Sequence, residues 1–96
     1  MNKNGLYQIK RHCWMLYPSK DIAAASSDTS PYRISANIEA AYLSKQFNCN
    51  VSYLSSNTIF FPVETDGRYV KVISGEGVGW IIVEDWAEKY FEEVKE

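Results

Sequence analysis

The segment IFFPVETDGRYVKVISGEGVGWIIV, residues 59–83, decides the fold of this chain. It contains three short runs of β-branched and aromatic residues, joined at Asp66-Gly67 and at Ser74 to Gly77. In the middle run Val70 and Val72 fall on one face and their neighbours on the other, as in a half-buried antiparallel strand. Asp-Gly between two such runs favours a tight hairpin, because the turn needs positive φ angles that suit Gly and Asp. The segment therefore predicts a three-stranded meander.

The chain before the meander has less regular patterns. Residues 5–17 predict a strand, either continuous or broken by a bulge near residues 10–12. Residues 18–34 have loop composition, with at most one helical turn at Ala23 to Ala25. A helix is predicted over Ser35 to Phe47, with Ser35 as its N-cap. The residues expected on the core side of this helix are spaced at i, i+4, i+7 and i+8: Ile34, Ile38, Ala41 and Tyr42.

Four shorter features complete the expected fold. Residues 49–54 alternate like a strand, and Pro62 requires residues 59–63 to form an edge, a bulge or a bend. Residues 84–90 are long enough for one helical turn, and residues 91–94 predict a brief last strand. We expect one domain over residues 1–96, mainly β, because no linker or repeat divides the chain.

Composition limits the classes of function. The chain is 46% hydrophobic and 23% charged, which is typical of a soluble globular domain. Its net charge of −2 argues against nucleic-acid binding, which depends on many Lys and Arg contacts to phosphates. No apolar run is long enough to span a membrane or form a signal-peptide core, so we expect no membrane partner and a cytoplasmic location. In that compartment Cys13 and Cys49 are expected to stay reduced and to form no disulfide.

Charge is unevenly distributed along the chain. Residues 1–33 carry five basic and two acidic side chains, whereas residues 84–96 carry two basic and six acidic ones. These segments either recruit two different partners or lie side by side and partly neutralise each other. The second alternative is the simpler one.

No arrangement of residues predicts catalysis, a metal site or a cofactor. His12 is the only histidine and precedes Cys13, but neither C-x-x-C nor H-x-x-x-H spacing accompanies them. Gly75 to Gly79 has no following Lys-Ser/Thr and leads into a strand, so it predicts a turn and not a phosphate loop. We therefore expect no enzyme.

The sequence VKVISGEGVGWI followed by KYFEEV resembles the end of an SH3-type barrel, in which a Gly-aromatic-Ile step leads through a 3₁₀ turn to a Tyr and a last strand. Bacterial SH3 domains are similar in their G-x-x-GW-[IV] ending, which residues 75–81 approximate. The chain also loosely resembles small SH3-like proteins carried by marine bacteriophages. The resemblance implies a small, partly open barrel of five to six antiparallel strands. A long loop and the helix at about 35–47 would be inserted after the first strand.

Three departures from the SH3 pattern affect the function implied. GLYQIK only partly matches the ALYDY run, the tandem Trp is absent, and no Pro precedes the terminal Tyr. Those residues form the groove for Pro-rich ligands, so such ligands are not implied. The function implied is a non-catalytic module that binds a protein or peptide; the alternative is a peptidoglycan-binding module of the bacterial SH3 type.

In SH3-type barrels the loop after the first strand and the turn before the last strand flank one shallow groove. The resemblance thus implies that Tyr17 and Tyr32 lie near Trp86 and Tyr90 and bind the ligand. Arg33, Glu84 and Asp85 would set the polarity along the rim. In the alternative interpretation the long loop folds over the groove and these rings seal it.

Overall fold

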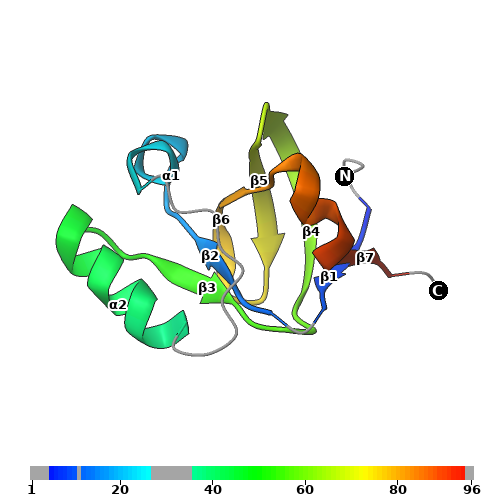
Figure 1. The fold of residues 1–96 in the computed structure, drawn as a ribbon, viewed down its shortest axis with the longest axis horizontal. Helices are drawn as coiled ribbons and strands as arrows, with labels where there is room; N and C mark the ends of the chain where they lie inside the picture. The colour runs from blue at the N-terminus through cyan, green and yellow to red at the C-terminus, as the bar shows by residue number, and fades with distance from the viewer. Residues whose placement is uncertain (1–4, 11, 27–35, 95–96) are drawn as a thin grey trace.

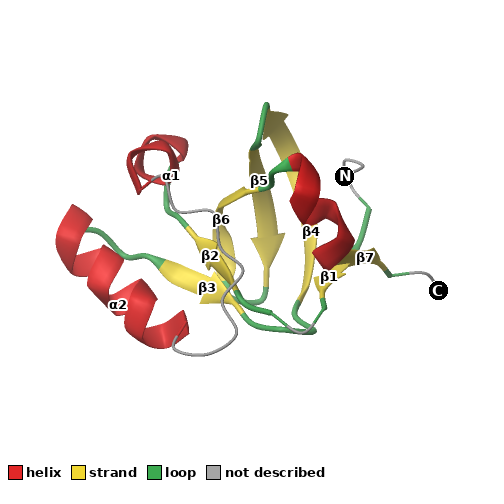
Figure 2. Cartoon of the chain, viewed as in Figure 1, coloured by secondary structure: helices red, strands yellow, loops and turns green. Residues whose placement is uncertain are grey.

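The structure, a computed structural model, describes residues 5–10, 12–26 and 36–94. Within them the chain forms seven strands in two antiparallel sheets and three short helices (Figures 1 and 2). The larger sheet has the order β6-β5-β4-β1-β7, with β1 at Tyr7–Ile9, β4 at Ile59–Asp66, β5 at Tyr69–Ser74, β6 at Gly77–Ile82 and β7 at Phe91–Glu93. The smaller sheet pairs β2, Trp14–Leu16, with β3, Ser52–Leu54. The helices are α1, Lys20–Ser26, α2, Ala36–Phe47, and the 3₁₀ helix η1, Asp85–Tyr90.

The meander is confirmed as β4, β5 and β6. Val70 and Val72 of β5 are buried, while the residues that alternate with them along the strand are partly exposed. The first hairpin turn lies one residue later than expected, because Asp66 pairs with Tyr69 and the chain turns at Gly67-Arg68. Gly67 takes a φ of 62°, which is why a glycine suits this position.

Pro62 lies in β4, the first strand of the meander and the central strand of the larger sheet, where β4 is flanked by both β5 and β1. Of the three predicted alternatives, the structure shows a bulge: the register with β5 shifts between Pro62 and Glu64. The irregularity lets a residue without an N–H group sit inside a sheet.

The first strand-like run divides into two strands in different sheets, so the prediction of five to six strands is too low. β1 pairs with β4 on one side and with β7 on the other, whereas β2 pairs with β3. The pairing of β1 with β7 brings the basic start beside the acidic end, and the Nζ of Lys10 lies 3.6 Å from the Oε2 of Glu92. This confirms the interpretation that the two segments lie side by side.

The two sheets meet where β2 passes over β6. Tyr17 and Trp80 exchange backbone hydrogen bonds of 2.8 and 2.7 Å. Buried residues form two clusters, one between the two sheets and η1, the other between β2, β6 and the helices α1 and α2. In the part of the chain that the structure describes, the sheets do not close into a barrel.

The helices differ from the prediction in their packing. α2 has the predicted extent over the described residues, but its expected core face is wrong: Ile38 and Tyr42 are 65% and 62% exposed. Its buried residues are Ala36, Ala40 and Leu43. Small side chains on this face let the helix approach the second cluster closely, so α2 packs through its alanines. α1 is seven residues long and exceeds the single turn expected. Ile34 and the N-cap Ser35 lie outside the described residues.

Candidate functional site: aromatic side chains on η1

η1 connects the last meander strand to β7 and is held by the residue at its centre. Ala87 is fully buried, and its N–H donates to the Glu84 carbonyl at 2.9 Å. Phe91, directly after η1, is buried in the first cluster. With these two positions facing inward, the short helix turns other side chains outward. Trp86 is 48% exposed, a large fraction for an aromatic residue in a domain with buried tryptophan elsewhere.

Tyr90 is the centre of a group of aromatic rings. Trp86 meets it edge-on, with ring centroids 6.1 Å apart and an interplanar angle of 89°. The His12 ring meets Tyr90 from another side at 4.8 Å and 80°. Trp14, which is buried, lies 5.9 Å from the Tyr90 ring. Tyr90 is thus fixed by a core residue, and Trp86 and His12 extend the aromatic area into solvent.

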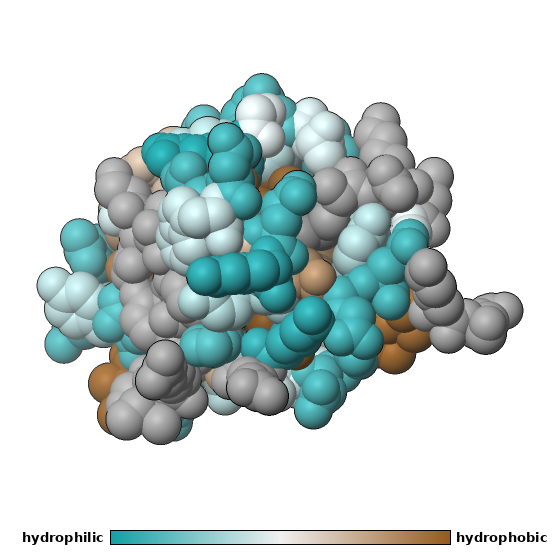
Figure 3. All heavy atoms as spheres, turned by 45° about the vertical axis from the view of Figure 1, so that its right-hand side comes forward, coloured by the Kyte–Doolittle hydropathy of each residue, from teal (hydrophilic) through white to brown (hydrophobic). Residues whose placement is uncertain are grey.

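Two lysines border these rings. The Nζ of Lys89 lies 5.5 Å from the Tyr90 centroid, within cation–π range. Lys10, His12, Lys89 and Tyr90 line a hollow of about 380 Å³. We call the five residues Lys10, His12, Trp86, Lys89 and Tyr90 the η1 surface. The side of the molecule that carries η1 is mostly hydrophilic, with apolar residues exposed in small areas (Figure 3).

His12 is oriented by the backbone as well as by Tyr90. Its Nδ1 lies 3.3 Å from the Lys10 carbonyl oxygen, so a proton on Nδ1 is donated to that oxygen. The other ring nitrogen is then an acceptor.

The structure brings together only part of the predicted site. Trp86 and Tyr90 are adjacent, as expected. The prediction that Tyr17 belongs to the site is wrong. Tyr17 is 1% exposed and packs in the second cluster, because its backbone bridge to Trp80 holds it between the sheets. It therefore contributes no ring to the surface. Tyr32 and Arg33 lie outside the described residues.

Sequence reasoning missed Lys10, His12 and Lys89 as neighbours of the aromatic pair. The opposite charges of the two ends of the chain were the signal that could have found them. Pairing of β1 with β7 sets Ile9 opposite Phe91, and the Lys10 N–H donates to the Tyr90 carbonyl at 2.8 Å. The residues that follow β1 must then lie beside the end of η1.

A second hollow beside η1 is acidic. Residues Thr65, Gly67, Val70, Val83, Glu84, Asp85 and Glu88 line about 250 Å³. Arg68 partly neutralises it, since its guanidinium donates to Glu84 at 2.7 Å. Within residues 5–10, 12–26 and 36–94, no group of three or more His, Cys, Asp or Glu side chains is arranged to hold a metal ion.

Comparisons with protein-family models, curated proteins and solved structures find no match to this chain. None of the helices in the described residues is long and apolar enough to cross a membrane. On the η1 surface three rings offer flat apolar area, and the two ammonium groups beside them attract carboxylates.

Proposed function

We propose that this chain is a small, non-catalytic interaction module, acting in the cytoplasm, that binds a protein or peptide through the η1 surface. The observation that carries the proposal is the exposure of Trp86 beside Tyr90 and His12. The same chain buries Trp14 at 2% exposure, so burying an indole is possible for this fold. An indole left half in solvent, next to two more rings, has the composition of an interface hot spot.

We also propose that the fold is related to the SH3-type barrel. Three features support this. The first strand lies beside the last one, an insertion with α1 and α2 follows β2 and precedes the meander, and a 3₁₀ helix joins the meander to the last strand. The hydrogen-bonded bridge from Tyr17 to Trp80 closes part of the gap between the sheets, as a partly open barrel requires.

The ligand that fits this surface is an extended peptide segment carrying apolar and acidic side chains. An aliphatic or proline side chain would lie against the Trp86 and Tyr90 rings. A carboxylate beside it would meet Lys10 and Lys89. The ion pair that Lys10 makes with Glu92 does not prevent this, because both side chains are about half exposed and such pairs are weak.

The test is capture of partners on the immobilised protein, with Trp86→Ala as the variant. Tyr42→Ala is a matched control, because Tyr42 is an exposed aromatic residue on α2, away from η1. We expect the wild-type protein and the Tyr42 variant to retain the same protein from a lysate and the Trp86 variant to lose it. Retention by all three would contradict the proposal.

A parallel sedimentation assay with purified peptidoglycan separates the two binding classes. Aromatic rings also stack on sugars, so the bacterial cell-wall modules that the sequence resembles are the relevant comparison. Co-sedimentation that depends on Trp86, without retention of a protein, would replace a protein partner by peptidoglycan. We expect no co-sedimentation.

A further inference from the structure

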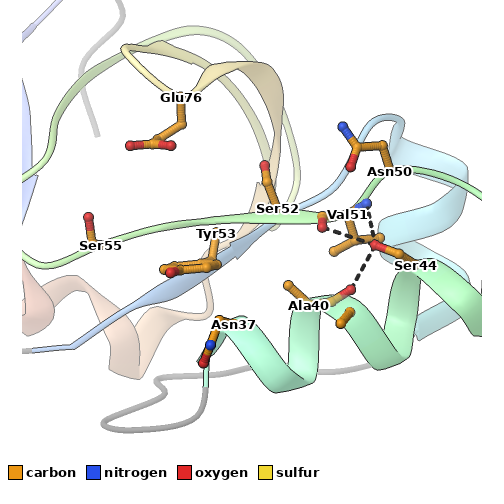
Figure 4. Close-up of a pocket in the computed structure, with 10 residues that line it drawn as sticks. Asn37, Ala40, Ser44, Asn50, Val51, Ser52, Tyr53, Ser55 and Glu76 are labelled. Atoms are coloured by element: carbon orange, nitrogen blue, oxygen red, sulfur yellow. Dashed lines mark hydrogen bonds between the residues drawn. The ribbon is translucent and has the colours of Figure 1, made fainter.

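A groove of about 400 Å³ runs between α2 and β3 (Figure 4). One wall is the face of α2 that carries Asn37, Ala40, Ala41 and Ser44, and the other is the chain from Asn50 to Ser55. Glu76, from the turn between β5 and β6, also lines it. The volume is in the range of ordinary ligand sites. In Figure 1, α2 and β3 lie on the opposite side of the molecule from η1, the orange helix beside β4 and β7, so this groove and the η1 surface are separate.

The free edge of β3 faces this groove. The backbone N–H and C=O of Tyr17 are hydrogen-bonded to Trp80 of β6, on the side of β2 that faces away from β3. Because every second residue of a strand directs its N–H and C=O to the same side, the odd-numbered residues of β2 direct theirs away from β3. Trp14 and Leu16 consequently direct theirs toward their partners Leu54 and Ser52. The residues between and beside those partners, Val51 and Tyr53, must direct their N–H and C=O groups away from β2.

Val51 has its edge N–H satisfied within the fold. This N–H donates to the Ser44 hydroxyl at 2.8 Å. That hydroxyl has one proton to donate and lies 2.7 Å from the Ala40 carbonyl oxygen and 3.0 Å from the Val51 carbonyl oxygen (Figure 4). Ser44 therefore acts at one end of the groove as the neighbouring strand would.

Tyr53 is the next residue with this orientation, and no side chain of the described residues takes the same place beside it. In the described part of the chain, no hydrogen bond to its N–H or C=O is found on the groove side. Buried or half-buried backbone groups are satisfied in the great majority of cases. The N–H and C=O of Tyr53 point outward as they do at the edge of a sheet, where a neighbouring β-strand would pair with them.

The lining suits a single extended chain. Asn37 lies in the first turn of α2 and Ser44 lies seven residues on, about 10 Å along the helix axis. That length matches roughly three residues of an extended strand. Asn37, Asn50 and Ser52 add side-chain donors and acceptors along the walls. Glu76 is the charged residue among those that line the groove.

We propose that the edge of β3 is a second binding site, which takes an extended peptide segment carrying a Lys or Arg. The segment would pair with the backbone N–H and C=O of Tyr53 as an added strand. Its basic side chain would reach Glu76. This site is independent of the η1 surface, since the two differ in binding mode and in the charge of ligand that they favour.

The test begins with selection of linear peptides from a random phage-displayed library on the full-length Trp86→Ala protein. The selected peptide is then titrated against Tyr53→Pro, which removes the edge N–H in a strand position where proline is tolerated. Tyr53→Ala is the matched control, because it removes the ring and keeps the N–H. Glu76→Gln tests the charge.

We expect Tyr53→Pro to weaken binding about tenfold, as the loss of a hydrogen bond implies, and Tyr53→Ala to have a smaller effect. Glu76→Gln should weaken binding of peptides that contain Lys or Arg. Amide exchange in the Trp86→Ala protein used for the selection provides a second measurement if the proline variant does not fold. The Tyr53 amide should exchange fast in the free protein and slowly with peptide. Failure to select any peptide, or an unchanged Tyr53 amide in the complex, would overturn the proposal.

Discussion

A Cβ atom placed on Gly79 would lie 2.7 Å from the Cγ of Leu16 and equally close to the carbonyl oxygen of Tyr17. β2 therefore crosses β6 at a distance that only a glycine permits. The crossing is also where Tyr17 and Trp80 form their backbone bridge. Contact between the two sheets depends on a residue with no side chain.

Gly79→Ala should destabilise the protein by about 1–3 kcal/mol, since overpacking at a backbone carbonyl cannot be relieved by rotating a side chain. For a domain of this size that lowers the melting temperature by roughly 4 °C or more. Gly75→Ala is the control: its Cβ meets nothing within 4 Å. Thermal unfolding followed by circular dichroism measures both, and equal stabilities would contradict the packing described here.

Ser44→Ala should also lower stability, by about 1 kcal/mol or more, because it leaves the N–H of the buried Val51 without its acceptor. Ser52→Ala is the control, since no hydrogen bond of its hydroxyl to another described residue is found. Urea denaturation gives the unfolding free energy of each variant. If the two serines proved equivalent, Ser44 would not be what joins α2 to β3.

The elements predicted correctly depend on local signals. The meander, the brief last strand and the helix ending at Phe47 each follow from residue period, turn residues or helix formers within a short window. The helix face was wrong because the stripe of larger apolar residues, Ile38 and Tyr42, is exposed, whereas α2 packs through alanines. Only the tertiary contact decides between these two faces.

The site was half predictable for a similar reason. Trp86 and Tyr90 were identifiable because they stand on a short charged turn. Tyr17 could not be placed, since its burial depends on the bridge to Trp80, which is 63 positions further along the chain. In the sequence, the candidate partner of His12 is Cys13, its direct neighbour. Its actual partner is Tyr90, brought near by the pairing of β1 with β7.

Cys13 and Cys49 should form no intramolecular disulfide. Both are free, and the β2–β3 register, continued by one residue, sets Cys13 opposite Ser55. Cys49 lies six positions before Ser55, and the strand between them, Ser52–Leu54, is extended, so the two cysteines lie toward opposite ends of it. A disulfide requires Cα atoms within roughly 7 Å. Intact mass of freshly prepared protein should equal that of the reduced chain. A mass lower by two protons would contradict the register.

The pKa of Lys20 should fall when Asp66 is replaced. A hydrogen bond to Asp66 is the main cause that raises the pKa of Lys20 above 10.5, and the charge of Asp66 is the next. The contribution of a raised lysine pKa to stability is full below pH 10.5 and is lost as the pH rises through the folded-state value. Because both side chains are exposed, we expect a small effect on stability and a clear one on titration.

The measurement is an NMR titration of the Lys20 side chain in the wild-type protein and in Asp66→Asn. Asp21→Asn serves as the control, since Asp21 raises the same pKa but is a lesser cause. We expect the Asp66 variant to titrate at lower pH and the Asp21 variant to change less. Equal titration of all three would show that Asp66 is not the partner of Lys20.

The most direct test of the η1 surface is one experiment on Trp86→Ala that records the melting temperature and the affinity for the captured partner in the same preparation. Because Trp86 is half exposed, its ring contributes little to the core, and we expect the melting temperature to fall by no more than a few degrees. Truncating a binding anchor costs about 2 kcal/mol, so affinity should fall roughly 30-fold. A large drop in melting temperature, with affinity intact in the fraction still folded, would contradict this account.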